Sequence, residues 1–370
     1  MLVGIILTVA AALAAPSAQA SKEVVDYFGT ADGGGSLGEG QGTLGGEFHR
    51  PTYVAVNQTG AGPAAAGEIY VVESGIQDES GALFGNNRIQ RFSHDDGGTP
   101  SNPYDDSYQF LSAWGTDVDA TPSGGSDYEI CTVAAECKAG VAGGGNGTPA
   151  GNGTFSRLTG IAVDQDTGRV YAVDPNNSRV DVYEGDGTFL RSFGWDVAGS
   201  GPGDTGTGYE VCVAADGDVC KAGAGGSGTG QIGQRILNQR AGGIAVSQPD
   251  GNPTSGTVFV ADVLNHRVDT FGLDGSAPSS FGSGTFNPLG ATSDRSPETV
   301  AVDSRGIVYA GNRIFGGSFA YGDTIERYDS ENANGGGVGF LPPLTGEIAE
   351  GQRLTVDAAG GRFRLGFGGD

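Results

Sequence analysis

The feature that most constrains the fold of this chain is an internal repeat of four short β-forming runs. In the clearest unit these runs occupy residues 155–164, 168–174, 177–183 and 187–194. Asp-Thr-Gly at 166–168 and Gly-Asp-Gly at 185–187 separate neighbouring runs and are typical of hairpin turns. The unit therefore predicts four antiparallel strands joined by short connections.

The same order of runs recurs three more times. Unit one has runs at 53–56, 68–72, 87–92 and 110–115; unit three at 243–246, 257–262, 265–271 and 278–282; unit four at 299–303, 306–310 and 323–328, followed by a poorer last strand. A four-stranded sheet cannot bury both faces alone, whereas radial stacking covers the faces and leaves only short edges. Repetition about every 40–50 residues, insertions aside, predicts a β-propeller. In it the first strand of each unit lines the axis and the last forms the rim.

These units resemble NHL repeats. Unit three carries the resemblance most clearly, with Val260-Ala261-Asp262 followed by Asn265-His266-Arg267-Val268. The resemblance covers roughly residues 24–330 apart from insertions, and implies the six-bladed, TolB-like propeller superfamily. Only four clear units are present, so we predict an all-β propeller of four-stranded antiparallel blades that is incomplete or open. The resemblance does not fix an activity, because such propellers serve as scaffolds, ligand sensors and occasionally lyases or hydrolases.

The ends of the chain differ from the repeat. An apolar run from Leu2 to Ala15 precedes Ala18-Gln19-Ala20, so residues 1–20 are predicted to be a secretory signal peptide, although no Lys or Arg precedes the run. The propeller is assigned to residues 21–340, and Val24–Gly29 resembles a spare fourth strand. Residues 341–370 are predicted to be a linker followed by a degenerate blade or by the start of a further β-module in a longer chain.

Two Gly-rich insertions interrupt the propeller at residues 116–154 and 196–234, here called insertion one and insertion two. Each carries a Cys pair in a matching context, which runs from Tyr-Glu-Ile/Val-Cys to Cys-Lys-Ala-Gly. An even cysteine count after a signal peptide favours disulfides, so we expect Cys131–Cys137 and Cys212–Cys220. A zinc site is disfavoured because neither pair has the usual spacing and no His is near. We expect little other structure in the insertions, because Gly-rich chain is flexible.

Charge excludes some classes of partner. The 370 residues include 44 Asp and Glu against 20 Lys and Arg, a formal net charge of −24. The chain thus lacks the basic patch of a nucleic-acid-binding protein, and its field repels phosphate and anionic membranes. No segment after the leader is long and apolar enough to span a bilayer. A soluble extracellular protein, secreted or held at the cell surface, fits this composition best.

Residues that could carry chemistry are few. Four aspartates end first or second strands and could gather Ca²⁺, or could equally serve turns: Asp164, Asp174, Asp262 and Asp303. Arginines recur near the third strand, at Arg88, Arg179, Arg267 and Arg327, and recurrence favours a structural bond to a neighbouring loop over anion binding. The three His residues are too few to suggest a zinc lyase, and His266 is expected to be a turn residue.

Three functions follow from this sequence. The first is a non-catalytic binding scaffold for a protein, glycan or small ligand, with no cofactor or catalytic residue assigned. The second is a metal-dependent lyase or lactonase-like hydrolase that uses the four aspartates. The third is a structural component of a cell surface or matrix. No nucleophile elbow, zinc-protease helix or phosphate loop is present to favour the second.

Overall fold

The structure is a computed structural model, and it describes residues 42–74, 76–77, 83–99, 102, 105–121, 127–143, 151–233, 242–248, 254–282, 294–315, 324–329 and 339–340. The predicted signal peptide, the predicted strand at 24–29 and the predicted C-terminal segment at 341–370 lie outside these residues. No helix in the described part of the chain is long and apolar enough to cross a membrane.

In the described part of the chain, four antiparallel sheets of four or five strands form the framework and are here called blades. Blade one contains β1 (Pro51–Val56), β2 (Ile69–Glu73), β5 (Arg88–Asp95), β6 (Ser107–Thr116) and β7 (Tyr128–Cys131). Blade two contains β8 (Gly160–Val163), β9 (Val170–Asp174), β10 (Arg179–Tyr183), β11 (Phe189–Trp195) and β13 (Tyr209–Val213). Blade three contains β15 (Ile244–Val246), β16 (Thr257–Asp262), β17 (Arg267–Gly272) and β18 (Ser279–Phe281). Blade four contains β19 (Asp294–Val302), β20 (Val308–Phe315), β21 (Thr324–Asp329) and β22 (Gly339–Phe340).

Smaller elements lie outside the four main sheets. Two short ribbons pair β3 (Ile76–Gln77) with β4 (Leu83–Phe84) and β12 (Ala198–Ser200) with β14 (Val219–Cys220). Each insertion also contains one 3₁₀ turn, Ala134–Glu136 in insertion one and Ala214–Asp216 in insertion two.

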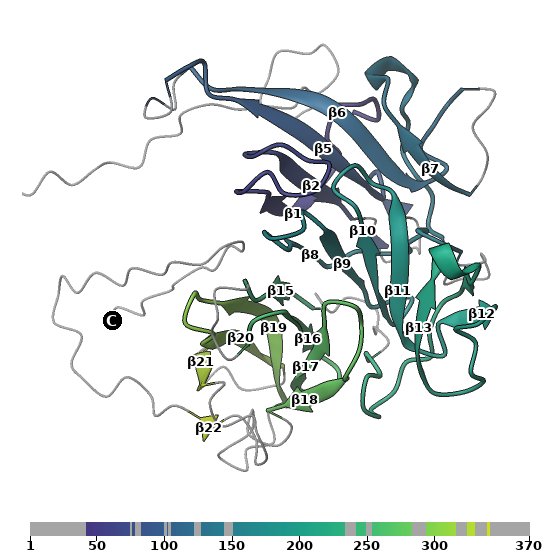
Figure 1. Ribbon diagram of the computed structural model, residues 1–370, viewed down its shortest axis with the longest axis vertical. Helices are drawn as coiled ribbons and strands as arrows, with labels where there is room; N and C mark the ends of the chain where they lie inside the picture. The colour runs from purple at the N-terminus through teal and green to yellow at the C-terminus, as the bar shows by residue number, and fades with distance from the viewer. Residues whose placement is uncertain are drawn as a thin grey trace, which may run out of the picture.

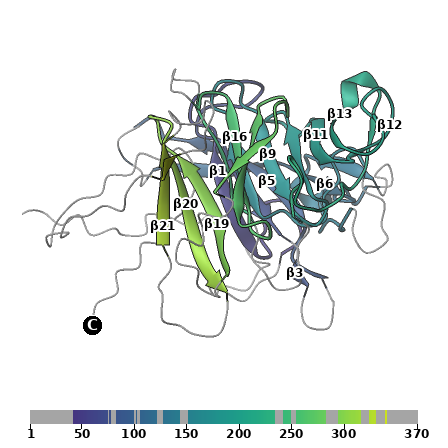
Figure 2. The same cartoon turned by 90° about the horizontal axis from the view of Figure 1, so that it is seen from below.

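The sheets follow one another as an arc, in the radial arrangement of a propeller (Figure 1). The innermost strands touch in order, since β8 contacts β1 on one side and β15 on the other, and β15 contacts β19. Figure 2 shows blade four at one end of this array. Among the described strands no comparable contact joins β19 to β1. The all-β, propeller-like architecture is therefore confirmed, and the described residues form four blades in an open arc.

Each pair of neighbouring blades shares one buried apolar cluster. Ile89 of blade one lies in the same cluster as Ile161 of blade two, Val180 of blade two with Ile244 of blade three, and Val268 of blade three with Val300 of blade four. The first-strand residues Ile161, Ile244 and Val300 occupy the same position in their respective blades. The third-strand residues Ile89, Val180 and Val268 likewise share one position. The core is thus a series of repeated blade interfaces rather than one central cluster.

The expectation that the insertions carry little structure beyond their disulfides is wrong. Each contributes a fifth strand to the outer edge of its blade, β7 beside β6 and β13 beside β11. The two strands pair in the same register, since Tyr128 faces Thr116 as Tyr209 faces Trp195. Backbone hydrogen bonds to an existing strand edge can order a short Gly-flanked run that would be unstable alone.

Candidate functional site

The most elaborate polar feature of the framework is a buried arginine that recurs in three blades. Arg88, Arg179 and Arg267 each lie directly opposite the carboxylate that ends the second strand, namely Glu73, Asp174 and Asp262. The residue before each arginine, Asn87, Ser178 or His266, has a positive φ between 43° and 52°. This backbone turn directs the chain into the third strand, so His266 is a turn residue of the repeat, as expected.

Each guanidinium fastens loops to its blade. Arg179 pairs with Asp181 at 2.9 Å and donates to the carbonyls of Gly151, Thr154 and Lys221. Arg88 pairs with Glu73 at 2.7 Å and also donates to backbone carbonyls, including that of Lys138. Charge-assisted bonds of this kind are strong when buried. The structure thus gives these arginines the structural role that their recurrence predicted.

Arg327 does not belong to this set. Its partner across the sheet is Tyr309, and the position equivalent to Arg88 in blade four is Thr324. Arg327 lies three residues after that position, so it matches Arg91 instead. Blade four therefore lacks the buried arginine of the other three.

The four aspartates proposed as calcium ligands are not brought together. Asp164 and Asp303 follow first strands, while Asp174 and Asp262 end second strands, and antiparallel pairing sends these two positions to opposite ends of a blade. Among the described residues, no three His, Cys, Asp or Glu side chains cluster closely enough to hold a metal ion. The arrangement does not fit a shared metal centre.

Hydrogen bonds within the repeat already occupy these carboxylates. Asp174 accepts from the backbone N–H of Ser156, Arg157, Asn176 and Asn177, and Asp262 accepts from the N–H of Gly233 and Asn265. Asp164 accepts from Asp166 N–H at 3.2 Å and from the Thr167 hydroxyl at 2.5 Å. Asp303 accepts from the N–H of Arg305 and Ile307. A carboxylate that accepts several N–H groups serves a turn, and has little capacity left for Ca²⁺.

Burial changes the acidity of several of these groups. Burial raises the pKa of Asp174, against the opposing effect of its N–H donors. Burial also raises the pKa of Asp181 to about 6. In blade three, burial and the Asp262 carboxylate raise the pKa of Asp269 to about 9. Burial alone would raise the pKa of Asp303. Hydrogen bonds from Arg305 and from the backbone outweigh burial and hold this pKa below its ordinary value.

Raised pKa values often mark active sites, and a carboxylate pair such as Asp262 and Asp269 could in principle exchange a proton. Both side chains are buried within blade three, Asp262 at 2% exposure and Asp269 at 0%. A shallow hollow between blades two and three reaches Asp262 but is lined mainly by apolar residues such as Val173, Ile232 and Leu264. These carboxylates are therefore placed to hold Arg267 rather than to contact a substrate.

The two insertions are a second polar feature, and they are copies of one another. A lysine after the second cysteine pairs with an aspartate at the start of each insertion: Lys138 with Asp117 at 2.6 Å, and Lys221 with Asp196 at 2.8 Å. Both aspartates have a left-handed backbone, with φ of 57° and 56°. The same backbone bond then closes each loop, from Lys138 N to Val118 O and from Lys221 N to Val197 O.

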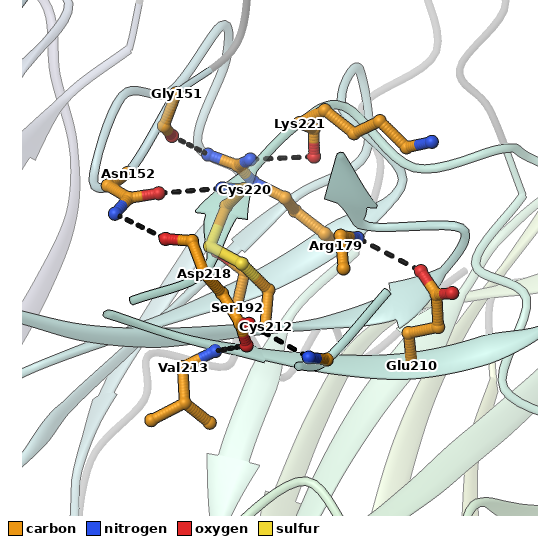
Figure 3. Close-up of a disulfide and its surroundings, with 12 residues drawn as sticks. Gly151, Asn152, Arg179, Ser192, Glu210, Cys212, Val213, Asp218, Cys220 and Lys221 are labelled. Carbon is orange, nitrogen blue, oxygen red and sulfur yellow. Dashed lines mark hydrogen bonds between the residues drawn. A yellow bond between two sulfur atoms is a disulfide. The ribbon is translucent and has the colours of Figure 1, made fainter. Parts of the chain in front are cut away.

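The disulfides are the expected ones, Cys131–Cys137 and Cys212–Cys220. Figure 3 shows the second, which lies beside the Arg179 guanidinium and its bond to the Lys221 carbonyl. Asn152, which comes from insertion one, accepts from Cys220 N–H and donates to the Asp218 carbonyl. Its side chain therefore fastens the end of one insertion to the disulfide loop of the next.

Each insertion also reaches the following blade through a tyrosine. Tyr128 donates to the carbonyl of Gly187 in the β10–β11 turn, and Tyr209 donates to that of Gly275 in the β17–β18 turn. Gly153 and Gly230 lie under these rings, where a Cβ atom would clash with the tyrosine. The insertions are thus clasps between blades one and two and between blades two and three.

These clasps expose several large apolar side chains. The large hydrophobic side chains exposed in the described part of the chain are Leu44, Val54, Ile130, Val133, Val141, Val219 and Ile325. Ile130, Val133 and Val141 belong to insertion one, and Val219 belongs to insertion two. Leu44 lies beside insertion one, because the next residue, Gly45, bonds to the Ala134 carbonyl at 2.8 Å. Sequence reasoning missed this surface; the signal was the duplicated motif around the cysteines.

Comparison with known proteins finds only distant similarities. No family model matches the chain, and no curated protein matches its sequence. Among solved structures, a protein of Lactobacillus plantarum is 12% identical with a TM-score of 0.36, over 85% of this chain and 80% of that one. A 6-phosphogluconolactonase candidate of Bacteroides uniformis is 14% identical with a TM-score of 0.33, over 78% of this chain and 70% of that one.

Hydrazine synthase of Kuenenia stuttgartiensis is also similar, at 13% identity and a TM-score of 0.34, over 83% of this chain. The match spans about half of that chain, 52%. Likeness at this level carries no information about activity.

Proposed function

We propose that this protein is a secreted, non-catalytic binding scaffold whose partner contacts the outer surface of the two insertions. The observation that carries the proposal is a contrast between the framework and the insertions. The buried arginines and the four aspartates are engaged within the repeat, whereas the insertions hold apolar side chains in solvent on a surface fixed by disulfides. Exposed apolar side chains on a rigid support are typical of interaction sites.

Each insertion combines this apolar surface with an acidic character. Insertion one carries Asp117, Asp119, Asp127, Glu129 and Glu136 against Lys138 as its only basic residue, and insertion two has the corresponding excess. A partner with apolar and basic groups would be complementary to such a surface, and electrostatic steering would speed its approach. A basic protein segment fits this description better than a neutral glycan does.

The test is site-specific photocrosslinking of the mature chain in the extracellular medium of its host. A photoreactive residue replaces Val133 or Val219, and a control replaces Arg305, whose side chain is exposed on a blade-four loop. We expect one adduct, shared by the first two positions and absent from the third. Equal labelling at all three positions, or labelling at none, contradicts the proposal.

The metal-dependent enzyme is the weaker alternative, because its four aspartates are separated and bonded within turns. Elemental analysis of the purified mature chain addresses it directly. One calcium or zinc retained per chain would favour the enzyme. The proposal that the protein belongs to a cell surface or matrix is compatible with a scaffold, and the identity of the crosslinked partner would decide it.

A further inference from the structure

Blade three holds two buried carboxyl groups against one guanidinium. Arg267 lies 2.8 Å from the Asp269 carboxylate and 3.5 Å from that of Asp262, and both aspartate side chains are buried. The two carboxyl groups are also hydrogen-bonded to each other, and such a bond needs a proton on one of them. With that proton the cluster is neutral. Without it the cluster carries one uncompensated negative charge away from water, which is costly.

Blade one contains a version of this cluster that is always neutral. Arg88 pairs with Glu73 at 2.7 Å, and the residue equivalent to Asp269 is Gln90, whose amide donates to Glu73 at 2.7 Å. Gln90 thus supplies the donor that a protonated carboxyl group would supply, but cannot lose it. Blade two has Asp181 at this position, and burial raises its pKa as well. The comparison indicates that the interior of a blade favours a neutral group at this place.

The surroundings of Asp269 favour its protonated form. Burial and the Asp262 carboxylate raise the pKa of Asp269 to about 9, against the opposing effect of Arg267. Tyr209 of β13 also faces Asp269, as a neutral phenol, and the residues paired with Asp269 on the two neighbouring strands are uncharged. Because the folded-state pKa lies above the ordinary value of 3.8, the neutral cluster persists at low pH and is lost as the pH rises through about 9.

A Gly-rich segment at the end of insertion two, residues 226–233, covers the cluster. Arg267 donates to three of its carbonyl groups at 2.7 to 2.9 Å, and its Gly233 N–H donates to Asp262 at 3.1 Å. Ile232 is its only large apolar side chain. The strands of blade three are held by ladder hydrogen bonds and by the blade interfaces, so this segment is the part of the surroundings that opens at the lowest cost.

We propose that Arg267, Asp262 and Asp269 form a proton-dependent latch that holds residues 226–233 against blade three while the two carboxyl groups share a proton, and releases the segment when that proton is lost. Release admits water to the ionised pair, which lowers the cost of the uncompensated charge. The latch is therefore closed in acidic and neutral medium and open in alkaline medium.

The latch also supports the clasp of insertion two. Gly230, within the segment, lies under the Tyr209 ring, and Tyr209 fastens the insertion to the Gly275 carbonyl of blade three. Opening of the segment removes this support, so a partner bound at insertion two should be released as the pH rises. This consequence rests on the proposed function, whereas the latch itself does not.

Hydrogen–deuterium exchange of the mature chain at pH 7 and pH 10 tests the latch, with rates corrected for the intrinsic effect of pH on amide exchange. The hydrogen-bonded amides of Gly228, Gln231 and Gly233 report on the segment. We expect their corrected exchange rates to rise at least tenfold at pH 10. Asp269→Asn, which keeps a neutral group at this position, should abolish the rise.

Residues 42–47 of blade one are the matched control. Arg88 holds the carbonyl groups of Thr43, Leu44 and Glu47 in the same way, but through the cluster that contains Gln90. Their corrected exchange should be equal at the two pH values. Gln90→Glu introduces a second carboxyl group beside Glu73, and should make the exchange of residues 42–47 rise with pH.

The latch is overturned if the corrected exchange of residues 226–233 is equal at the two pH values, or if its rise persists in Asp269→Asn. An equal rise in residues 42–47 of the wild type would indicate general unfolding and overturn it too. If Asp269→Asn does not fold, a Gln90→Glu chain without the new pH dependence overturns it.

Photocrosslinking from Val219 at the same two pH values separates the latch from the proposed function. Loss of the adduct at pH 10 together with opening of the segment supports the regulatory step, and an adduct that persists while the segment opens contradicts that step. A chain whose segment opens but which forms no adduct at pH 7 contradicts the proposed function and leaves the latch standing.

Discussion

Replacing Arg179 by methionine tests whether a buried arginine holds the blade together. The guanidinium lies at 0% exposure, pairs with Asp181 at 2.9 Å and donates to three backbone carbonyls. Methionine fills much of the same space, so the change in stability should come mainly from the lost polar contacts and not from a cavity. Removing one partner of a buried ion pair costs about 3–5 kcal/mol, and a buried acceptor left without a donor costs about 1 kcal/mol or more. We therefore expect the free energy of unfolding to fall by about 4–6 kcal/mol.

The assay is urea denaturation followed by tryptophan fluorescence at pH 8 and pH 5. The loss in the free energy of unfolding caused by Arg179→Met should be smaller at pH 5 than at pH 8. The reason is that the pKa of Asp181 is raised to about 6, so that at pH 5 protonation neutralises the carboxylate that has lost its partner. The double variant Arg179→Met with Asp181→Leu should recover part of the loss for the same reason. Arg305→Met is the matched control: its pair with Asp303 is 2.6 Å long, but its side chain is 69% exposed, so we expect a change below about 1 kcal/mol.

A loss below about 1 kcal/mol in Arg179→Met would refute this reasoning. So would a deficit that is identical at the two pH values, since it would separate the arginine from the Asp181 charge. If Arg179→Met does not fold, Arg179→Lys keeps the charge but cannot reach the same set of acceptors. It should unfold at a urea concentration between those of the wild type and the double variant.

Three further predictions concern the insertions and the buried carboxylates. Gly230→Ala should lower the free energy of unfolding by more than about 2 kcal/mol, because the new Cβ atom would clash with the Tyr209 ring. Gly217→Ala is its control: Gly217 has a φ of 86° but open space around it, so the substitution should cost only about 1 kcal/mol of backbone strain. Serine at both positions of the Cys212–Cys220 pair should lower the free energy of unfolding by roughly 2–3 kcal/mol, and a loss near zero would show that the loop is fixed by its hydrogen bonds alone. The free energy of unfolding should decline as the pH rises from about 4 to about 9, because the pKa of Asp269 is raised from 3.8 to about 9 in the folded chain. Asp269→Asn should flatten that decline, and an unchanged slope would exclude Asp269 as its cause.

The strands of the four blades could be predicted from sequence because each is a local pattern. A β-forming run followed by a turn residue is recognisable within a few residues, and repetition corrects errors in any one copy. The structural role of Arg88, Arg179 and Arg267 could also be predicted from sequence, since each arginine lies two residues after an Asn, just before the third strand of its unit. Arg327 was misassigned because the grouping by sequence ignored strand register, which places Arg327 three residues beyond the position equivalent to Arg88.

The fifth strands could not be predicted in this way. Tyr-Glu-Ile/Val-Cys is only four residues long, Gly-rich chain flanks it, and its strand partner lies more than ten residues away in sequence. Its stability depends on the open edge of β6 or β11, which a local pattern does not reveal. The clue was that two separate insertions share this motif and the Cys-Lys-Ala-Gly that follows.

Repetition within the chain also separates structure from function. A side chain that recurs at the same place in several blades, such as Arg88, Arg179 and Arg267, is explained by what a blade needs, whatever the protein binds. The features that depart from the repeat require another reason. Among the described blades, the clasps occur on blades one and two only. The sites at which this molecule meets other molecules should therefore be sought at the insertions, and not among the recurring charged residues.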